Sequence, residues 1–426
     1  MNKYIKQAIA QQGALLNQWA EVSQPVGLGL TMPFAIQISN GVFRVDPTFD
    51  LLNYSGITVA KTYYVDKAVG NDSNAGDSMA SGHALKTISA ALAKSDVDRI
   101  YIQAGYYYKN ESWVNLTRSV QLIGVGGNVY LTSDVYNEIG AFTAVNNHYR
   151  ATVGGGRTIG HVWDGKTKDA NGDDVKLTLA ASEEAVESTA GSWYQSGTTV
   201  YLHTLDGRAP DTDLHFYLST STILYLVDNK TIYLENIHSR GGSAAGNFGN
   251  ASAAGTNTKA FIKNSSFKYG SIGDLIRDYG CKEFIMQNCV VAQSKADLIN
   301  HQKVNGVDPF AIEVDVISRN GGSDTTNQAS TQHDGGTVVR INGVYKNSVG
   351  QNIADVGTGK SWLLGCLAKS SVNGTGFYSA RLMWLDSCRS EGNTYPIEVP
   401  SGATSYFRNF TKDSGNNLIG GTLLEY

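Results

Sequence analysis

The chain of 426 residues carries a formal net charge of −4, and 41% of its residues are apolar. This apolar share suits a folded chain with a large core and argues against intrinsic disorder. The small net charge gives no bulk attraction to nucleic acid or to an anionic membrane, so we expect neither as a partner. A neutral partner such as a glycan fits this charge better.

No close pair of the kind that binds zinc occurs among the four cysteines, which are Cys281, Cys289, Cys366 and Cys388. We interpret them as buried thiols and expect neither a metal nor another cofactor. The sequence GVGG at Gly124 lacks the helix and the lysine of a phosphate-binding loop, and no Gly-x-Ser-x-Gly elbow occurs. Serine-based acyl chemistry therefore has no motif to support it.

The N-terminus does not contain the apolar core of a signal peptide, because Gln11, Gln12 and Asn17 interrupt the residues that follow Lys3 and Lys6. Nor does any stretch approach the roughly 18 consecutive apolar residues of a membrane-spanning helix. We therefore expect a protein that is made soluble and that, if it leaves the cell, leaves by another route such as lysis.

Residues 2–22 predict a helix with one apolar stripe, because apolar side chains recur at steps of three, four and seven. The stripe consists of Ile5, Ala8, Ile9, Leu15, Leu16 and Trp19. A surface helix on a globular domain is one interpretation, and the terminal position favours a docking or oligomerising helix within residues 1–24. Residues 25–62, with Pro25, Pro33 and Pro47, are typical of a connector with short strands.

Three signals follow Tyr63: a polar run from Gly70 to Ser78, a short amphipathic helix over about 84–93, and a strand over 99–104. The next strand is expected over 119–125. The region from residue 63 to the C-terminus is therefore interpreted as one further unit.

The second half of the chain contains an internal repeat of a short apolar strand, then Asn or Asp, then a polar turn. Eight copies align on Asn236, Asn264, Asn288, Asp315, Asn342, Gly365, Asp386 and Asn409, with steps of 28, 24, 27, 27, 23, 21 and 23 residues. Such periods indicate a solenoid or a propeller. Propeller blades need about 40 to 45 residues, whereas one coil of a parallel β-helix needs a little over twenty. The recurring Asn and Asp side chains would form a hydrogen-bonded ladder.

The segments YYVDKAVGNDSNAGDS, HALKTISAAL and DRIYIQAGYYY resemble the N-terminal cap of the pectate-lyase-like β-helix superfamily, of the bacteriophage tailspike type. The resemblance implies an all-β, right-handed, single-stranded parallel β-helix whose open end is plugged by a capping helix. A plug is needed because an uncapped solenoid exposes apolar core and unpaired backbone. Tailspikes of this family are trimeric, so the resemblance also implies a homotrimer.

Residues from about 140 to 218 interrupt the period and are expected to form an insertion. Its segment GSWYQSGTTVYLH predicts a hairpin. Similar hairpins occur as insertions in tailspike and glycosidase β-helices. Trp193, Tyr194 and Tyr201 would either stack on sugar rings or cover a local core.

A candidate site emerges thirteen or fourteen residues after the ladder positions, where Asp278, His301 and Asp355 recur and a longer coil places His333 and Asp334. These groups are expected to form one column on the outer face, although a decorative polar column is the plainer interpretation. We expect Asp334, Asp355, His333 and His301 to be catalytic and Asp278, Asp297 and Glu313 to contact substrate. Glu313 alternates with Ile312 and Val314, which predicts that it points outward.

Adjacent coils of a parallel β-helix lie about 4.8 Å apart, so Asp334 and Asp355 would approach the roughly 5 to 5.5 Å of a retaining glycosidase. His301 and His333 would orient the substrate or, in a lyase, remove a proton beside a uronic carboxylate.

Together with these residues, the resemblance to tailspikes implies a homotrimeric virion spike, synthesised in the cytoplasm of a host bacterium, that binds a bacterial capsule or lipopolysaccharide and depolymerises it. Its N-terminus would contact other tail proteins. A non-catalytic adhesin and a secreted bacterial polysaccharide lyase or hydrolase are the two alternatives, because the fold does not determine activity.

Overall fold

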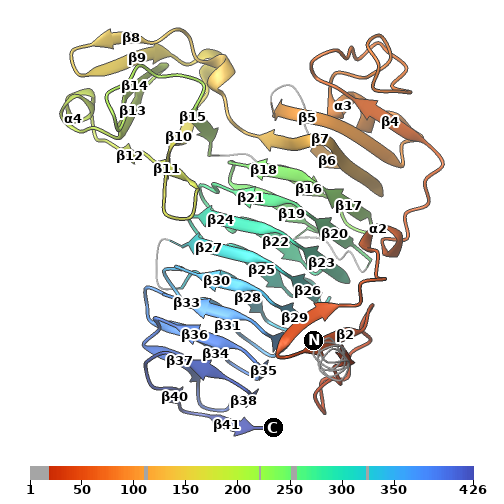
Figure 1. Cartoon of the computed structure of the whole chain (residues 1–426). Helices are drawn as coiled ribbons and strands as arrows, with labels where there is room; N and C mark the ends of the chain where they lie inside the picture. The colour runs from red at the N-terminus through yellow and green to blue at the C-terminus, as the bar shows by residue number, and fades with distance from the viewer. Residues whose placement is uncertain (1–18, 110–113, 220–221, 251–256, 323–325) are drawn as a thin grey trace, which may run out of the picture.

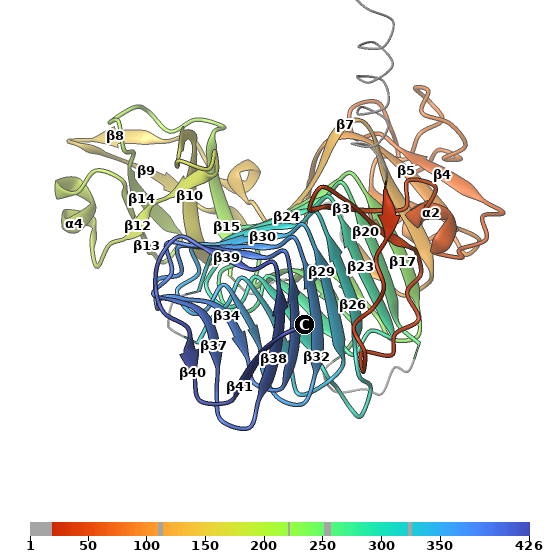
Figure 2. The same cartoon turned by 60° about the horizontal axis from the view of Figure 1, so that its bottom comes forward.

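The structure is a computed structural model that describes residues 19–109, 114–219, 222–250, 257–322 and 326–426. Most of these residues form an all-β parallel solenoid of about 13 turns (Figures 1 and 2). Each strand pairs in parallel with its equivalents in the neighbouring coils, as in the pairs of β20 with β23 and of β23 with β26. The predicted parallel β-helix is therefore confirmed.

Three faces make up each coil, and two of them meet in one continuous sheet. Face one comprises β4 (Thr62–Val65), the first halves of β5 (Arg99–Tyr108) and β7 (Val120–Thr132), β17 (Thr231–Glu235), β20 (Lys259–Lys263), β23 (Glu283–Gln287), β26 (Phe310–Val314), β29 (Thr337–Ile341), β32 (Lys360–Leu364), β35 (Leu382–Asp386), β38 (Thr404–Arg408) and β41 (Thr422–Glu425). Face two comprises the second halves of β5 and β7, β18 (Ile237–Arg240), β21 (Ser266–Lys268), β24 (Val290–Ser294), β27 (Ile317–Gly321), β30 (Val344–Lys346), β33 (Leu367–Lys369), β36 (Arg389–Glu391) and β39 (Thr411–Lys412).

Face three is a separate parallel sheet of ten strands. It comprises β6 (Val114–Leu116), β16 (Thr222–Leu226), β19 (Ala244–Phe248), β22 (Ile276–Tyr279), β25 (Ile299–Gln302), β28 (Ser330–His333), β31 (Ile353–Asp355), β34 (Thr375–Ser379), β37 (Tyr395–Val399) and β40 (Leu418–Ile419). Apolar side chains from all three faces meet in one long core inside the coils.

The turn between faces one and two explains the repeat. Its residues adopt a left-handed conformation, with φ between 51° and 62°, which Asn, Asp and Gly tolerate best. The Nδ2 atom of Asn288 donates to Oδ1 of Asn264 at 2.7 Å, so part of the expected ladder forms. Both side chains are exposed, however, and the repeat therefore selects Asn mainly for its backbone conformation.

One position of the repeat alignment was wrong. Leu364 pairs with Asp386, and the residue after each of them, Gly365 and Ser387, has the left-handed φ. The turn residue is therefore Ser387 rather than Asp386, and the last two steps of the repeat are both 22 residues, from 365 to 387 and from 387 to 409. Asp386 itself is buried and pairs with Arg408.

The helix α3 (Ile88–Leu92) occupies the N-terminal end of the coils, as expected for a cap. Thr87 begins it by accepting a hydrogen bond from the amide of Ala90. Ile88 and Ala91 are buried against the first coils. The strands that follow the helix are longer than predicted, because β5 and β7 each turn from face one to face two without a break.

Residues 19–57, here called the N-terminal arm, pack against the outside of face one (Figure 1). The arm contains β1 (Ala20–Glu21), β2 (Ile36–Ser39), β3 (Val42–Val45) and α2 (Leu51–Tyr54). Residues 1–18 of the predicted N-terminal helix lie outside the described residues, and Ala20 and Glu21 at its predicted end form a strand. The outer side chains that the arm covers are Tyr233, Phe261, Ile285, Ile312, Val339, Trp362 and Trp384.

The insertion begins directly after β7, at Ser133, and ends at Ser219. It contains η1 (Tyr136–Glu138), β8 (Thr143–Val145), β9 (His148–Thr152), η2 (Gly154–Gly156), β10 (Ile159–Lys168), β11 (Asp174–Lys176), β12 (Thr178–Leu179), α4 (Glu183–Ser188), β13 (Ser192–Ser196), β14 (Thr199–His203) and β15 (Leu214–Leu218). The predicted hairpin is confirmed, since β13 pairs antiparallel with β14.

Within the described part of the chain, no helix has the length and hydropathy needed to cross a bilayer. The four cysteines are free and buried, as expected from the sequence.

Candidate functional site

The predicted titratable column exists, but it faces the interior of the coils. Asp278 pairs with His301, His301 with Gln332, and Gln332 with Asp355, so these residues lie above one another on face three. Their exposed fractions are 0% for Asp278 and His301 and 5% for Asp355. The prediction of an outer column is therefore wrong, and Gln332 stands where His333 and Asp334 were expected.

Glu313 also points inward, contrary to the prediction. The alternation in its strand is inverted, because Ile312 and Val314 pack under the N-terminal arm. Glu313 is fully buried and accepts hydrogen bonds from Ser330 and Tyr345, each at 2.7 Å. An apolar outer face covered by another segment cannot be distinguished from an inner face by periodicity alone.

These buried charges form one internal network. His301 lies between two carboxylates, with Nδ1 2.8 Å from Asp278 and Nε2 3.0 Å from Glu313. Burial lowers the pKa of His301, but the hydrogen bonds to the two carboxylates outweigh burial and raise it. Arg340 donates to both oxygens of Asp355 at 2.9 Å. The charges compensate one another inside the fold, so the roles predicted for Asp278, His301, Glu313 and Asp355 at a polysaccharide are withdrawn.

The other predicted site residues differ in exposure: Asp334 is exposed and His333 is partly exposed, whereas Asp297 is only 6% exposed. His333 Nε2 lies 3.7 Å from Asp297 Oδ2, and its side chain is 33% exposed. Burial raises the pKa of Asp297. Burial alone would lower the pKa of His333, but the hydrogen bond and the charge of Asp297 outweigh burial and raise it. Asp334 is exposed in a left-handed turn, whereas Asp355 is buried. These two carboxylates therefore do not form the predicted pair across adjacent coils.

The hairpin aromatics divide between core and surface. Trp193 is 2% exposed and packs inside the insertion, so its predicted contact with sugar is wrong. Tyr194 and Tyr201 are half-buried and stack on each other with ring centroids 6.1 Å apart. These two remain accessible from the outside.

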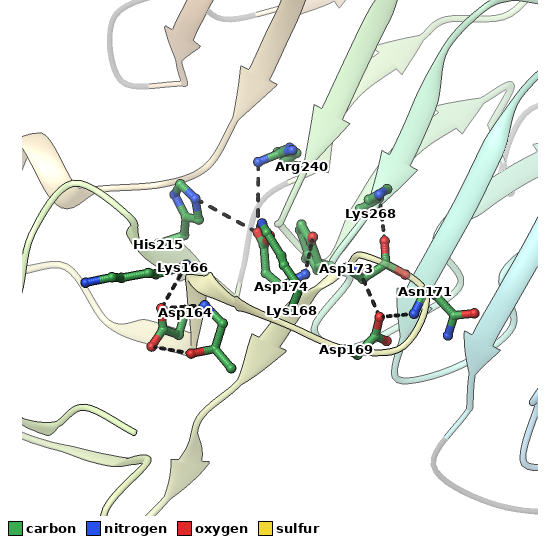
Figure 3. Close-up of polar contacts among 12 residues, drawn as sticks. Asp164, Lys166, Lys168, Asp169, Asn171, Asp173, Asp174, His215, Arg240 and Lys268 are labelled. Carbon is green, nitrogen blue, oxygen red and sulfur yellow. Dashed lines mark hydrogen bonds and ion pairs between the residues drawn. The ribbon is translucent and has the colours of Figure 1, made fainter. Parts of the chain in front are cut away.

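The loop between β10 and β11 docks the insertion onto face two (Figure 3). The buried carboxylate of Asp173 accepts from Lys268 at 2.7 Å and from two nitrogens of Arg319 at 2.8 Å. One coil further, Lys346 donates to Asn171 at 2.7 Å. These contacts span four coils, from β21 to β30, and therefore fix the insertion beside the solenoid.

Beside this docked loop, face two carries a groove of about 330 Å³. Its lining consists of Asn128, Tyr130, His238, Arg240, Asn264, Ser265, Ser266, Lys268, Asn288 and Val290. The two charged side chains of this lining are both cations, and amide and hydroxyl groups make up most of the remainder. Such a lining offers hydrogen bonds to many hydroxyl groups of a glycan.

A row of aromatic rings, here called the aromatic row, runs from the groove toward the insertion. His238 lies 5.4 Å from Tyr130, Tyr130 lies 4.6 Å from Tyr106, and Tyr106 lies 6.5 Å from His215, measured between ring centroids. The guanidinium of Arg240 lies over the Tyr130 ring at 4.4 Å. Tyr106 is 37% exposed, so part of the row faces solvent.

His215 and Asp174 lie where the aromatic row meets the insertion (Figure 3). His215 Nδ1 is 2.9 Å from Asp134, and its Nε2 is 4.0 Å from Asp174. Burial raises the pKa of Asp174, but Lys168 and Arg240 outweigh burial and lower it, so this carboxylate stays ionised. An imidazole held by one carboxylate and facing another is an arrangement suited to proton transfer.

Sequence reasoning missed both the groove and this junction. The groove residues stand two and four positions after the ladder residues, as His238 and Arg240 follow Asn236, and so could have been identified as outer positions of face two. The contribution of Asp174 and His215 had no sequence signal, because the docking of the insertion brings them there. Among the described residues, no group of three or more potential ligands is arranged to hold a metal ion.

No family model and no curated protein matches this sequence. Among solved structures, the chain is similar to a glycoside hydrolase with a TM-score of 0.46 and 10% identity, over 86% of this chain and 96% of that chain. For pectate lyase Pel9A the TM-score is 0.46 and the identity is 13%, over 86% of this chain and 80% of that chain. The Gp54 tailspike of Acinetobacter baumannii bacteriophage AP22, in complex with A. baumannii capsular saccharide, matches with a TM-score of 0.24 and 11% identity. This match covers 77% of this chain and 67% of that chain. At such identities, the chemistry of the site must be argued from this chain's own residues.

Proposed function

We propose that the protein binds a polysaccharide along the groove and the aromatic row. The observation that carries this proposal is the combination of stacked rings with amide, hydroxyl and cationic groups in one groove. The apolar faces of sugar rings pack on aromatic rings, while sugar hydroxyls exchange hydrogen bonds with the polar lining. A groove lying across several coils suits an extended polymer better than a small compact ligand.

The source of the glycan is proposed to be a bacterial capsule or lipopolysaccharide, with the protein acting as a homotrimeric tailspike on a virion. The sequence resemblance to tailspikes supports this role, and residues 1–24 are proposed to attach the spike to other tail proteins. The alternative of a non-catalytic adhesin predicts binding to the same glycan without cleavage.

Depolymerisation is proposed to occur at the junction of His215 and Asp174, which are 8% and 2% exposed. Unlike Asp355 inside the coils, Asp174 has an oxygen, Oδ2, without a hydrogen bond from any described residue. The ionised Asp174 and the imidazole of His215 lie beyond the cationic end of the groove, next to Arg240. A hydrolase must protonate the glycosidic oxygen, whereas a lyase must remove the proton beside a uronic carboxylate, and an imidazole next to a carboxylate suits either proton transfer. A second proposed location for substrate contact comprises Asp334, His333 and the buried Asp297 beside His333.

An array of bacterial capsular and lipopolysaccharide glycans tests the binding proposal. Tyr130→Ala is expected to weaken binding of the best glycan by about tenfold, or about 1.4 kcal/mol, because a stacking ring is lost. Tyr64→Ala is the matched control, since it removes a ring that packs on Tyr101 on face one, away from the groove. Equal losses in both variants, or no bound glycan on the array, would contradict the proposal.

Reducing-end formation from the bound glycan tests cleavage. We expect the wild-type protein to form reducing ends and His215→Gln to form at least about a hundredfold fewer, with binding retained. A wild-type protein that binds the glycan without producing reducing ends would instead be an adhesin.

A further inference from the structure

We infer that the groove contains a second catalytic centre, in which Ser266, His238 and Asn236 remove ester-linked acyl groups, such as O-acetyl, from a glycan. This inference rests on the proposed glycan binding only for its natural substrate. The constellation itself is defined by side-chain contacts that join two adjacent coils.

The parallel register places the nucleophile beside its base. His238 in β18 pairs directly with Ser266 in β21, and Ser266 Oγ lies 2.8 Å from His238 Nδ1. The other imidazole nitrogen, Nε2, lies 3.1 Å from Oδ1 of Asn236. A hydroxyl, an imidazole and an orienting side chain in this order form the arrangement that activates serine nucleophiles on several unrelated folds.

The hydrogen-bond partners of Asn236 determine which nitrogen of the His238 imidazole carries the proton. The Nδ2 group of Asn236 donates to the carbonyl oxygens of Gly124 and Gly127, so its Oδ1 faces the imidazole as an acceptor. Nε2 of His238 must therefore carry the proton, and Nδ1 presents its lone pair to the Ser266 hydroxyl. The left-handed turn holds Asn236 in place, so the recurring ladder position supplies the positioning residue.

The surroundings keep the imidazole neutral and supply positive charge. Burial, together with the nearby cations Arg240 and Lys268, lowers the pKa of His238 to about 4, so the imidazole is neutral at neutral pH and its free nitrogen can accept a proton. Both cations line the same groove as Ser266. Positive charge in a partly desolvated groove stabilises the oxyanion that forms when an ester carbonyl is attacked.

The reaction balances with water as the only co-reactant. Ser266 Oγ bonds to the acyl carbon while its proton moves to His238 Nδ1, and the carbon–oxygen bond to the sugar breaks. The sugar oxygen takes the proton from His238 and leaves as a hydroxyl group. Water then attacks the acyl-serine through the same imidazole, which releases the carboxylic acid and restores the Ser266 hydroxyl.

Other coils lack this combination at the same positions. The residues that follow His238 and Ser266 in this outer column of face two are Val290, Ile317 and Val344. Among these described coils, only the His238–Ser266 step therefore pairs a nucleophile with a base. The groove is centred on this step.

The test uses the full chain with 4-nitrophenyl acetate, a fluorophosphonate probe and an O-acetylated capsular polysaccharide. We expect hydrolysis of the nitrophenyl ester, release of acetate from the polysaccharide, and probe attached to Ser266 by mass spectrometry. Ser266→Ala and His238→Gln should each lower hydrolysis at least about a hundredfold. Ser196→Ala, which changes an exposed serine of the hairpin, should leave all three readouts unchanged.

Asn236→Gly separates positioning from folding, because glycine keeps the left-handed turn while removing the amide. We expect a lower kcat with little change in KM and an unchanged thermal transition. Full hydrolysis in Ser266→Ala, probe attached elsewhere, or a wild-type protein inert toward all three substrates would overturn the inference. Glycan binding without deacylation would overturn the inferred esterase centre and leave the proposed glycan binding intact. Hydrolysis of the nitrophenyl ester without glycan binding would support the esterase centre and contradict the proposed glycan binding.

Discussion

Inside the β-helix, the guanidinium of Arg340 and the carboxylate of Asp355 form two hydrogen bonds of 2.9 Å each. Removing one partner of a buried pair leaves the other charge uncompensated, at a cost of about 3 to 5 kcal/mol. We therefore expect Asp355→Asn to lower the free energy of unfolding by about 3 kcal/mol, measured by urea denaturation followed by circular dichroism.

Asp334→Asn is the matched control, because Asp334 is exposed and its change should stay within about 0.5 kcal/mol. Asp334→Asn also tests the remaining catalytic prediction, since any loss of glycan cleavage in it would not be caused by unfolding. A normally stable Asp355→Asn protein without turnover would restore a catalytic role for Asp355.

The second prediction concerns stability at alkaline pH. The folded-state pKa of His301 is raised above its ordinary value of 6.5 by its hydrogen bonds to Asp278 and Glu313, which outweigh burial. A histidine whose pKa is higher in the folded state than in the unfolded state stabilises the fold fully below the unfolded-state pKa. This stabilisation is lost as the pH rises through the folded-state pKa. We expect the thermal transition to fall as pH rises above about 6.5, and to fall less steeply in His301→Gln.

His83→Gln is the control for this titration, because His83 is on the surface and pairs with the equally exposed Asp77. It should follow the wild-type pH dependence. Glu313 acts in the opposite direction, since burial raises its pKa but His301 and Arg340 outweigh burial and lower it. Its contribution is present above its ordinary value of 4.5 and is lost as pH falls below that value. An identical pH dependence in wild type and His301→Gln would contradict the internal network.

The fold could be predicted because each coil repeats a backbone requirement, the left-handed turn after face one. That requirement selects Asn, Asp or Gly at fixed spacing, and the spacing reveals the length of a coil. The same signal placed Asp278, His301 and Asp355 in one column correctly. The spacing could not show whether this column faces the inside or the outside of the coils, because both sides of a coil carry polar and apolar side chains.

Two further features of the molecule had no local signal. The arm makes the outer side of face one apolar, which inverted the expected orientation of Glu313. The insertion brings Asp174 beside Arg240 from a residue 66 positions away in the sequence, from 174 to 240. Both features depend on docking between segments distant in sequence, and no period or motif reports such docking.

The third prediction concerns the N-terminal arm. A chain starting at Tyr63 would expose the apolar outer side of face one, including Phe261, Ile312 and Trp362. We expect this chain to aggregate or to unfold at lower temperature than the full chain. A chain starting at Trp19 keeps the arm and should retain the thermal transition.

The same pair of truncations tests the proposed trimer. If residues 1–18 contain the oligomerising helix, the chain starting at Trp19 should be folded but should show a lower mass in light scattering. An unchanged mass would assign oligomerisation to another surface or exclude it. Stability of the Tyr63 chain equal to that of the Trp19 chain would contradict the covering role of the arm.

The fourth prediction concerns the ladder. Because Asn288 is exposed and has φ of 54°, its substitution should depend on backbone strain rather than on a buried unpaired amide. We expect Asn288→Gly to cost less than Asn288→Val, which should lose about 1 to 3 kcal/mol because a β-branched residue is strained in that conformation. Urea denaturation of the two variants measures this order, and a larger cost for glycine would contradict it.

The last prediction concerns the docking of the insertion. Lys268 and Lys346 hold the loop between β10 and β11 through Asp173 and Asn171. Asp173→Asn would leave Lys268 and Arg319 without their buried carboxylate, so the insertion should separate more readily from face two. We expect faster proteolysis near Ser133 and Ser219 and weaker glycan binding.

The core of the coils does not depend on Asp173, so the main thermal transition should change little in this variant. Asp169→Asn is the matched control, because the described partners of Asp169 are all neutral amide groups of the loop and of face two. Weaker binding with unchanged proteolysis would mean that Asp173 affects the groove directly through Lys268. Unchanged binding and unchanged proteolysis together would show that the insertion is held by its other contacts, and that the junction of His215 and Asp174 forms without the ion pairs of Asp173.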